Sequence, residues 1–401
     1  MSEKLKELKK QIETEKLRLV VFKSAEKLGN KVDEHLLNMY GFDRDEYTFI
    51  VPISENFFQD GHFKVQIEET VRGKDLFFLT DIGNYSLEYK MHGFTNHTSP
   101  QDLFCELKDG IGASNCHAQS INVVMPLLYA GRQHRRNKRE NLACGAALRE
   151  VDSLSRIKSF VTFDAHDQGV EHAVHNMEFD NVYPTNTILE AFINNLPPEE
   201  LSSILFVAPD NGAGGRRDVY LNSFACDQIR RYAGSFYKKR DYNKLVNGKY
   251  KIIAHEYYGD RNLEDTTAII TDDMISSGGS MFDVIDELNK MGITRTYIIV
   301  TYALFTEGIE KFNEYYRDGK LNGIYTTNLS YIPEEYQNKP WLNVCDCSMS
   351  VADIIYSIHN DKSISPILRD RSEPIRLLER KFGEWKRSII YLIWILILWI
   401  S

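Results

Sequence analysis

The segment AIITDDMISSGGSM, residues 268–281, determines how the rest of the chain is interpreted. Its first four residues are typical of a buried strand, and two aspartates follow. A serine- and glycine-rich turn then leads into an amphipathic run. Backbone N–H groups in such a turn, together with a helix N-terminus, bind anions. The aspartates would repel an anion, so we expect them to bind sugar hydroxyls or a cation. The segment predicts a sugar-phosphate site, and a surface strand–turn–helix capped by Ser280 is the alternative.

Composition restricts the class of protein. A length of 401 residues favours two or three domains, and the net charge of -9 argues against a nucleic-acid partner, which needs a basic face. The six cysteines form no CxxC pair, so free thiols in a reducing cytoplasm are expected rather than a zinc site.

Both ends of the chain have unusual composition. Residues 1–16 predict a charged helix and not a signal peptide. Residues 389–400 are almost wholly apolar, but this run is shorter than the roughly 20 residues that span a bilayer. The segment could lie in a membrane interface, pack on a partner or be an artefact. We expect membrane contact only through this tail.

Strand-like apolar runs alternate with helical patterns along the chain, which predicts parallel sheets covered by helices. The expected strands are residues 19–23, 76–80, 121–128, 159–162, 204–208, 251–254, 268–271 and 296–301. The expected helices are residues 25–39, 144–154, 186–195, 218–232 and 281–291. The pattern occurs twice, once before and once after about residue 185.

The opening segment resembles the phosphoribosyl-pyrophosphate loop of type I phosphoribosyltransferases and of ribose-phosphate pyrophosphokinases. Six further segments resemble only the second family and keep its order over about residues 19–370. They are FFQDGHFKVQIEETVRGKDLFFL (57–79), MPLLYAGRQHRRNKR (125–139), FVTFDAHD (160–167), FVAPDNGAGGRRD (206–218), YKKRDYNK (237–244) and SVADIIYSIHNDKSISPIL (350–368).

The resemblance implies an α/β fold of two tandem type I phosphoribosyltransferase-like domains, each a mainly parallel sheet flanked by helices. Residues 1–185 would form the N-terminal domain with an ATP-binding hairpin. Residues 186–357 would form the C-terminal domain with the ribose-phosphate loop. Residues 358–401 would hold a closing strand that returns to the N-terminal domain, and the apolar tail.

The resemblance also implies an activity and its residues. The family transfers the diphosphoryl group of ATP to the anomeric hydroxyl of ribose 5-phosphate, giving 5-phosphoribosyl 1-pyrophosphate and AMP. It implies a cytoplasmic homo-oligomer, a dimer or a hexamer. The implied catalytic residues are Lys238 and Arg240. The implied ATP-binding residues are Phe58, Asp60, His62, Arg132, Gln133 and Arg139. The implied ribose-5-phosphate ligands are Asp272, Asp273, Ser276, Ser277, Gly278, Gly279 and Ser280. His166 and Asp210 match the ligands of Mg²⁺.

Without the resemblance, several of these residues have ordinary interpretations. His166 would be a core or capping histidine, and Phe58 a core residue. The remaining cations near residue 135, which are Arg135, Arg136 and Lys138, fit a solvated face or an anion-sensing surface. Arg216 and Arg217 follow a glycine-rich turn and could face phosphate.

The chain also departs from the family pattern. His62 stands where the family commonly has a glutamate, Gly131 is an extra residue, and His134 replaces an acidic residue. Residues 85–120 are longer than usual and are interpreted as a surface insertion. These departures leave a catalytically silent, regulatory relative that binds a sister subunit as the alternative function. A phosphoribosyltransferase would use the same loop, but it leaves the ATP hairpin and the repeated pattern unexplained.

Overall fold

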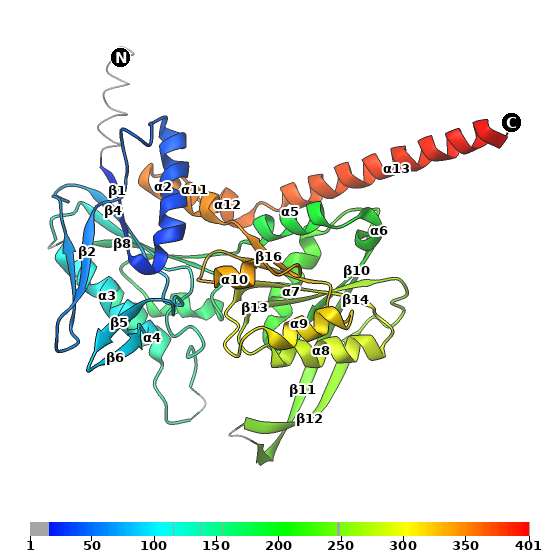
Figure 1. Cartoon of the computed structure of the whole chain (residues 1–401), viewed down its shortest axis with the longest axis horizontal. Coiled ribbons are helices and arrows are strands. Elements are labelled where there is room, and N and C mark those ends of the chain that lie inside the picture. Colours follow the sequence, from blue (N-terminus) through cyan, green and yellow to red (C-terminus); the bar gives the residue numbers. More distant parts are fainter. Residues whose placement is uncertain (1–15, 115, 137, 155, 247–248, 401) are drawn as a thin grey trace. The chain divides into compact units, whose positions relative to one another are not determined.

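The structure, a computed structural model, describes residues 16–114, 116–136, 138–154, 156–246 and 249–400 (Figure 1). The side chains of residues 238–255, 369 and 389–400 fall outside this description. The helix expected at residues 1–16 lies outside the described residues except for Lys16. The chain forms two compact units, and each is described by itself. The first holds the chain up to Pro184 with Asn328–Ile332 and Asp346–Arg369; the second holds Thr185–Thr327, Pro333–Cys345 and the chain from Asp370.

The first unit is built on a five-stranded sheet in which every pairing is parallel. All five residues of its second strand are buried, as expected where helices cover both faces of a parallel sheet. In spatial order the strands are β1 (Leu17–Val21), β4 (Asp75–Leu79), β7 (Ser120–Val124), β8 (Ile157–Phe163) and β9 (Glu178–Val182). The helices are α2 (Glu26–Tyr40), α3 (Pro100–Ala113), α4 (Ala143–Asp152), α11 (Ser348–His359) and α12 (Ser365–Arg369), with 3-10 turns η1 (Lys23–Ala25) and η2 (Gln168–Ala173).

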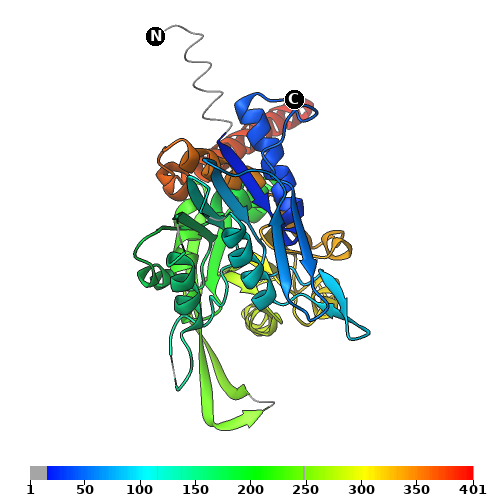
Figure 2. The ribbon, with the colours of Figure 1, turned by 90° about the vertical axis from the view of Figure 1, so that its left-hand side faces the viewer.

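Two antiparallel hairpins complete the first unit. One pairs β2 (Ile53–Phe57) with β3 (Phe63–Ile67), and the other pairs β5 (Glu88–Met91) with β6 (Phe94–His97). They lie beside each other in both views of the ribbon (Figures 1 and 2). A hairpin is therefore present near the residues expected, but it spans Ile53–Ile67, and the last residues of the expected range, 75–79, form β4 of the parallel sheet.

Residues 85–120 are only in part a surface insertion. The β5–β6 hairpin is exposed, but α3 buries Leu103, Phe104, Leu107 and Ile111 in the core of the unit. A capping box starts this helix, because Ser99 accepts from the Asp102 N–H and the Asp102 carboxylate accepts from the Ser99 N–H.

A pair of buried carboxyl groups joins the β2–β3 hairpin to α3. Glu55 is 8% exposed and Glu106 is 4% exposed. The Lys23 N–H donates to Glu55 Oε1 at 3.1 Å, and Lys23 Nζ lies 3.8 Å from Glu55 Oε2. Burial and the hydrogen bond to Glu55 raise the pKa of Glu106 to about 10. Glu106 therefore carries a proton at neutral pH.

The second unit is built on a seven-stranded sheet that is parallel except at one edge. There β12 runs antiparallel to β11, and the two form a long projecting hairpin (Figure 1). In spatial order the strands are β12 (Lys249–Gly259), β11 (Arg230–Val246), β10 (Ser203–Ala208), β13 (Thr267–Ile275), β14 (Arg295–Ala303), β15 (Gly323–Thr327) and β16 (Leu342–Cys345). The helices are α5 (Thr185–Asn195), α6 (Pro198–Leu201), α7 (Gly214–Ser223), α8 (Gly279–Lys290), α9 (Glu310–Arg317), α10 (Glu334–Gln337) and α13 (Ser372–Ile400), with the 3-10 turn η3 (Asn211–Ala213).

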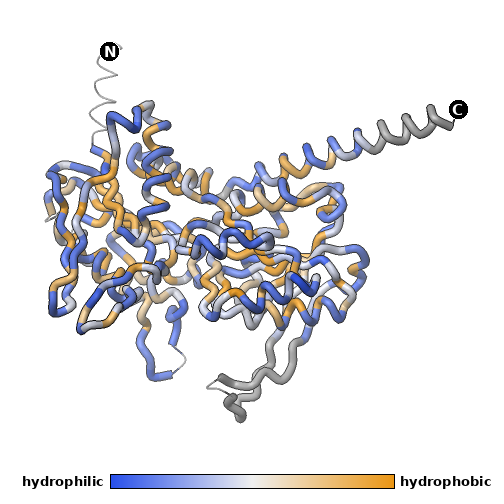
Figure 3. Tube along the Cα trace, in the orientation of Figure 1, coloured by the Kyte–Doolittle hydropathy of each residue, from blue (hydrophilic) through white to orange (hydrophobic). Residues whose placement is uncertain are grey.

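The first half of α13 is held on the second unit. Hydrophilic and hydrophobic residues alternate along it (Figure 3), and Leu377, Leu378 and Phe382 are buried in the same core as α5. Lys381 Nζ donates to the carbonyl oxygen of Ile193 at 2.6 Å, near the end of α5. The side chains of residues 389–400 lie outside the description. Within the described part of the chain, no helix has both the length and the apolarity needed to cross a bilayer.

The expectation of an α/β fold with two mainly parallel sheets flanked by helices is confirmed. Two local expectations are wrong. The helix expected over residues 218–232 ends at Ser223, because residues from Arg230 onward pair with β10 and satisfy their backbone groups in the sheet. The closing strand expected after residue 358 is absent from the described residues, where α12 and α13 stand instead. Pro366 at the second position of α12 suits the first turn of a helix, which leaves its N–H groups unpaired.

Candidate functional site

The two aspartates of the opening segment lie within β13, not after it. This strand continues through Ile275, and Asp272 and Met274 pair in register with Val300 and Tyr302 of β14. Asp273 is only 2% exposed, whereas the side chain of Asp272 is 20% exposed. Asp272 is therefore the more accessible of the two carboxylates.

The turn after β13 has the shape of an anion-binding loop. Residues 276–278 form the turn, and α8 begins at Gly279. Gly278 is the N-cap with φ +80°, and no side chain caps the helix. The alternative in which Ser280 caps this helix is therefore wrong, since Ser280 lies inside α8. The first N–H groups of a helix have no partner within it, so they are available to a ligand such as phosphate.

A buried arginine lies beside Asp272. Arg216 comes from α7, its side chain is 9% exposed, and its Nη1 is 3.7 Å from Asp272 Oδ1. Burial raises the pKa of Asp272, and the charges of Asp273 and Asp210 raise it further, whereas Arg216 lowers it. Asp272 thus lies beside one cation, Arg216, and within electrostatic range of two further carboxylates.

Asp210 follows β10 and turns back on its own loop. Its Oδ1 accepts from the N–H of Gly212 at 2.8 Å and of Ala213 at 3.3 Å, so Asp210 caps the 3-10 turn η3 that precedes α7. The carboxylate is exposed, and carboxylate oxygens are ligands that Mg²⁺ prefers. Asp210 and Asp272 therefore fit a magnesium–phosphate ligand in donor chemistry. Among the described residues, however, no three His, Cys, Asp or Glu side chains are grouped to hold a metal by themselves.

The two adjacent arginines of α7 have different partners. Arg217 donates from Nη1 to the Gly234 carbonyl at 3.2 Å and to Ser235 Oγ at 2.6 Å, so it is bound to the base of β11. Arg216 alone faces the acidic site. The expectation that both could face phosphate is wrong for Arg217.

The two predicted catalytic residues lie further along β11. The backbones of Lys238 and Arg240 lie in β11 and pair with His255 and Ile252 of β12. A register shift falls between residues 239 and 240. The side chains of both catalytic candidates lie outside the described residues, so their direction stays a prediction.

The first unit carries the other predicted residues in three places. Phe58, Asp60 and His62 share the turn of the β2–β3 hairpin, where the Phe58 N–H donates to the His62 carbonyl at 2.7 Å. His62 Nδ1 lies 3.1 Å from Asp60 Oδ2, and Phe58 is 56% exposed. The exposure of Phe58 excludes its ordinary interpretation as a core residue.

The second place is the loop of residues 128–142. Its start is a tight turn, with Ala130 at φ +54° and the Gln133 N–H donating to the Ala130 carbonyl at 2.8 Å. Arg132, Gln133 and Arg139 are exposed, as are Arg135, Arg136 and Lys138. This loop and the β2–β3 hairpin lie on different sides of the first unit in both views (Figures 1 and 2). The two groups of predicted ATP contacts are therefore not brought together within one copy.

The third place surrounds His166. Its ring centroid lies 5.3 Å from that of His134, and His134 Nε2 lies 3.4 Å from Asp167 Oδ2. The departure from the family pattern at position 134 thus stands directly beside the predicted magnesium ligand. The His166 group and the Asp272 group belong to different units, and each is described within its own.

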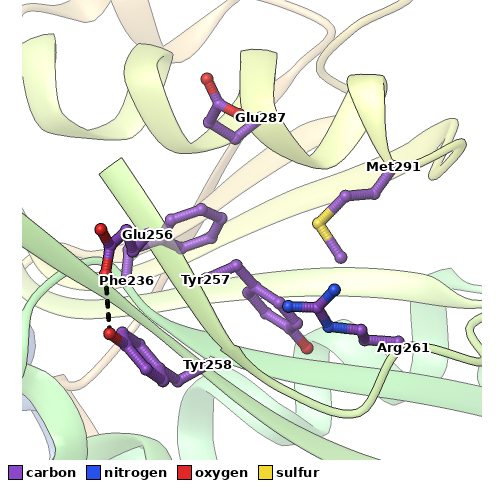
Figure 4. Close-up of a pocket in the computed structure, with 7 residues that line it drawn as sticks. All are labelled: Phe236, Glu256, Tyr257, Tyr258, Arg261, Glu287 and Met291. Atoms are coloured by element: carbon purple, nitrogen blue, oxygen red, sulfur yellow. Dashed lines mark hydrogen bonds between the residues drawn. The ribbon is translucent and has the colours of Figure 1, made fainter. Parts of the chain in front are cut away.

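One open pocket in the second unit coincides with none of these residues. It has a volume of about 650 Å³ and lies between β12 and α8 (Figure 4). Glu256 accepts from the Tyr258 hydroxyl at 2.7 Å at its mouth. Its lining residues are Phe236, Glu256, Tyr257, Tyr258, Arg261, Glu287 and Met291.

Comparisons with known proteins agree on one family. The model of the N-terminal domain of ribose phosphate pyrophosphokinase matches residues 17–151, and that of the phosphoribosyl synthetase-associated domain matches residues 259–369. Ribose-phosphate pyrophosphokinase A of Dictyostelium discoideum is 23% identical over 78% of this chain and 88% of its own length. A ribose-phosphate pyrophosphokinase of Synechococcus elongatus is 24% identical over 88% of this chain and 94% of its own length.

A solved structure confirms the fold class. The crystal structure of phosphoribosylpyrophosphate synthetase from Mycobacterium smegmatis matches with a TM-score of 0.68 and 18% identity. The match covers 86% of this chain and 99% of that one.

Proposed function

Because this chain belongs to the ribose-phosphate pyrophosphokinase family, we propose that it transfers the diphosphoryl group of ATP to ribose 5-phosphate. The products are 5-phosphoribosyl 1-pyrophosphate and AMP. One observation carries the proposal: Asp272, beside Arg216, lies in the strand that leads through a short turn into a helix N-terminus with no side-chain cap. This is the arrangement that a phosphorylated pentose needs, because its hydroxyls donate to a carboxylate while its phosphate accepts from N–H groups.

The 5-phosphate binds residues 276–280, and Asp272 accepts from a ribose hydroxyl. Arg216 opposes the rise in the pKa of Asp272 that burial and the neighbouring carboxylates cause, and so favours the ionised form, which is the better acceptor. Asp273 is the second predicted ribose ligand, and it is buried beside Asp272.

The anomeric oxygen attacks the β-phosphorus of ATP, and the bond between that phosphorus and the oxygen bridging it to the α-phosphate breaks. AMP leaves with that oxygen. A transfer of this kind depends on positioning and on neutralising negative charge more than on covalent help. Lys238 and Arg240 supply positive charge to the moving diphosphoryl group. Asp210 and His166 would hold Mg²⁺, which when bound neutralises phosphate charge and polarises the transferred group.

The position of the predicted ATP contacts supports a homo-oligomer. The β2–β3 hairpin and the loop of residues 128–142 lie on different sides of one unit (Figures 1 and 2). A single ATP that contacts both would need the hairpin of a second copy. We accordingly propose a dimer or a hexamer, acting in the cytoplasm.

The test is AMP release from purified protein with ATP, ribose 5-phosphate and magnesium. Lys238→Ala should reduce the turnover number by on the order of a hundredfold or more, because removing one preorganised charge from a transfer site has that effect. Lys239→Ala is the matched control, being the neighbouring cation in the same strand. No AMP from folded wild-type protein, with Lys238→Ala indistinguishable from it, would favour the silent regulatory relative.

A further inference from the structure

The β5–β6 hairpin contacts the turn that carries the predicted adenine contact. The rings of Tyr89 in β5 and Phe57 in β2 stack with centroids 4.1 Å apart and planes at 10°. Further along, Met91 Sδ lies 2.8 Å from the position that a Cβ on Gly61 would take. The two hairpins therefore touch just before the turn of residues 58–62 and within it.

The turn needs support from outside its own strands. A two-stranded hairpin by itself is at best marginally stable in water. Phe57 packs against its cross-strand partner Phe63, with centroids 4.9 Å apart, and Phe63 packs on the core of the first unit. Tyr89 covers the other side of Phe57. The residue next in sequence is Phe58, whose side chain is 56% exposed.

The β5–β6 hairpin is itself fixed at its base and within its turn. The Thr98 N–H donates to the Leu87 carbonyl at 2.8 Å, and Thr98 is followed by the capping box of α3. Asn96 Nδ2 donates to the Met91 carbonyl at 3.4 Å and to the Phe94 carbonyl at 3.3 Å. The hairpin is thus a firm element attached to a core helix.

We propose that the β5–β6 hairpin holds the turn of residues 58–62 in the conformation that receives the adenine ring of ATP. Tyr89 and Met91 are positioning residues, since they act through Phe57 and Gly61 and do not touch the nucleotide. This inference rests on the proposed function, in which that turn binds ATP. It gives a role to the segment in which the chain is longer than its family pattern.

The experiment compares three variants within the hairpin. Tyr89→Ala removes the stacked ring, Tyr89→Phe keeps it, and Phe94→Ala changes a side chain of the same hairpin that is 69% exposed. Hydrogen–deuterium exchange of residues 53–67 and the KM values for both substrates are measured on the full chain. A stacked aromatic pair contributes enough to stability for Tyr89→Ala to raise KM for ATP about fivefold to tenfold. In Tyr89→Ala, KM for ribose 5-phosphate should stay near the wild-type value. In Tyr89→Phe and Phe94→Ala, both KM values should stay near wild type.

The readouts separate this inference from the proposed function. If hydrogen–deuterium exchange of residues 53–67 is unchanged in Tyr89→Ala, the β5–β6 hairpin does not hold the turn of residues 58–62, whatever the activity. Faster exchange with an unchanged KM for ATP would overturn the positioning role. Wild-type protein that releases no AMP would instead refute the proposed function. Met91→Ala is the second variant if Tyr89→Ala fails to fold. It should raise KM for ATP and leave KM for ribose 5-phosphate unchanged. Equal changes in both KM values would contradict the positioning role.

Discussion

Gly278 is the residue of the turn between β13 and α8 that tolerates a side chain least. Its φ of +80° lies in the left-handed region. That conformation costs an L-residue about 1–2 kcal/mol. A Cβ at this position would also lie 2.4 Å from Phe312 Cζ and 3.0 Å from Phe282 Cε2. Ordinary carbon–carbon contacts are about 3.5–4.0 Å, so at least one ring would have to move by about 1 Å.

The rings around Gly278 have little room to move. Phe312 is 1% exposed, stacks on Trp341 at 5.8 Å, and packs 4.6 Å from Phe282. Overpacking of such a core costs about 1–3 kcal/mol. Gly278→Ala should therefore destabilise the second unit by about 2–5 kcal/mol, the sum of the two effects.

Gly292 provides the matched control at the other end of α8. Its φ is +88°, but a Cβ there would meet no atom within 4 Å. Gly292→Ala should cost only the backbone strain of about 1–2 kcal/mol. Urea unfolding, combined with hydrogen–deuterium exchange of residues 276–290, measures both variants. Equal losses in the two variants would refute the packing argument, and a loss below about 1 kcal/mol in Gly278→Ala would refute the backbone argument as well.

Three further results are expected. Arg216→Met should weaken ribose 5-phosphate binding by on the order of tenfold at pH 7, because losing this cation raises the pKa of Asp272 further and disfavours the ionised form that accepts best. Titration calorimetry against Arg216→Lys, which keeps a cation, measures the loss. Glu106→Gln should flatten the dependence of stability on pH: the pKa of this carboxyl is about 10 in the fold and about 4.3 when unfolded, so wild-type stability falls as pH rises between these values. Thermal melts at pH 5, 7 and 9 test this, and parallel wild-type and variant curves would contradict it. Leu378→Ala should lower the unfolding free energy of the second unit by about 2–5 kcal/mol, since the side chain is 0% exposed, while truncation after Ser388 should leave it unchanged. The opposite ranking in urea unfolding would show that the apolar tail, not the first half of α13, holds the helix.

Much of the fold is readable from local pattern. The apolar runs of β4, β10 and β14 predict buried parallel strands, because such strands are covered by helices on both faces and so carry few polar side chains. Local sequence signals predicted the ends of helices and strands less well where pairing with a distant strand sets those ends. Residues 224–232 have a helical composition, yet pairing with β10 takes Arg230 into a strand. Asp272 likewise remains in β13 because β14 continues beside it.

The sequence by itself determined the family, the alternation of strands and helices, and the residue types of the proposed sugar-phosphate site. These depend on local order along the chain, which a linear pattern records. Only the tertiary structure decided that Arg216 rather than Arg217 faces Asp272, and that His134 stands beside His166. It also decided that Tyr89 of β5 stacks on Phe57, next to the turn of residues 58–62. Each of these contacts joins segments distant in sequence, and packing, not local propensity, sets which side chains meet.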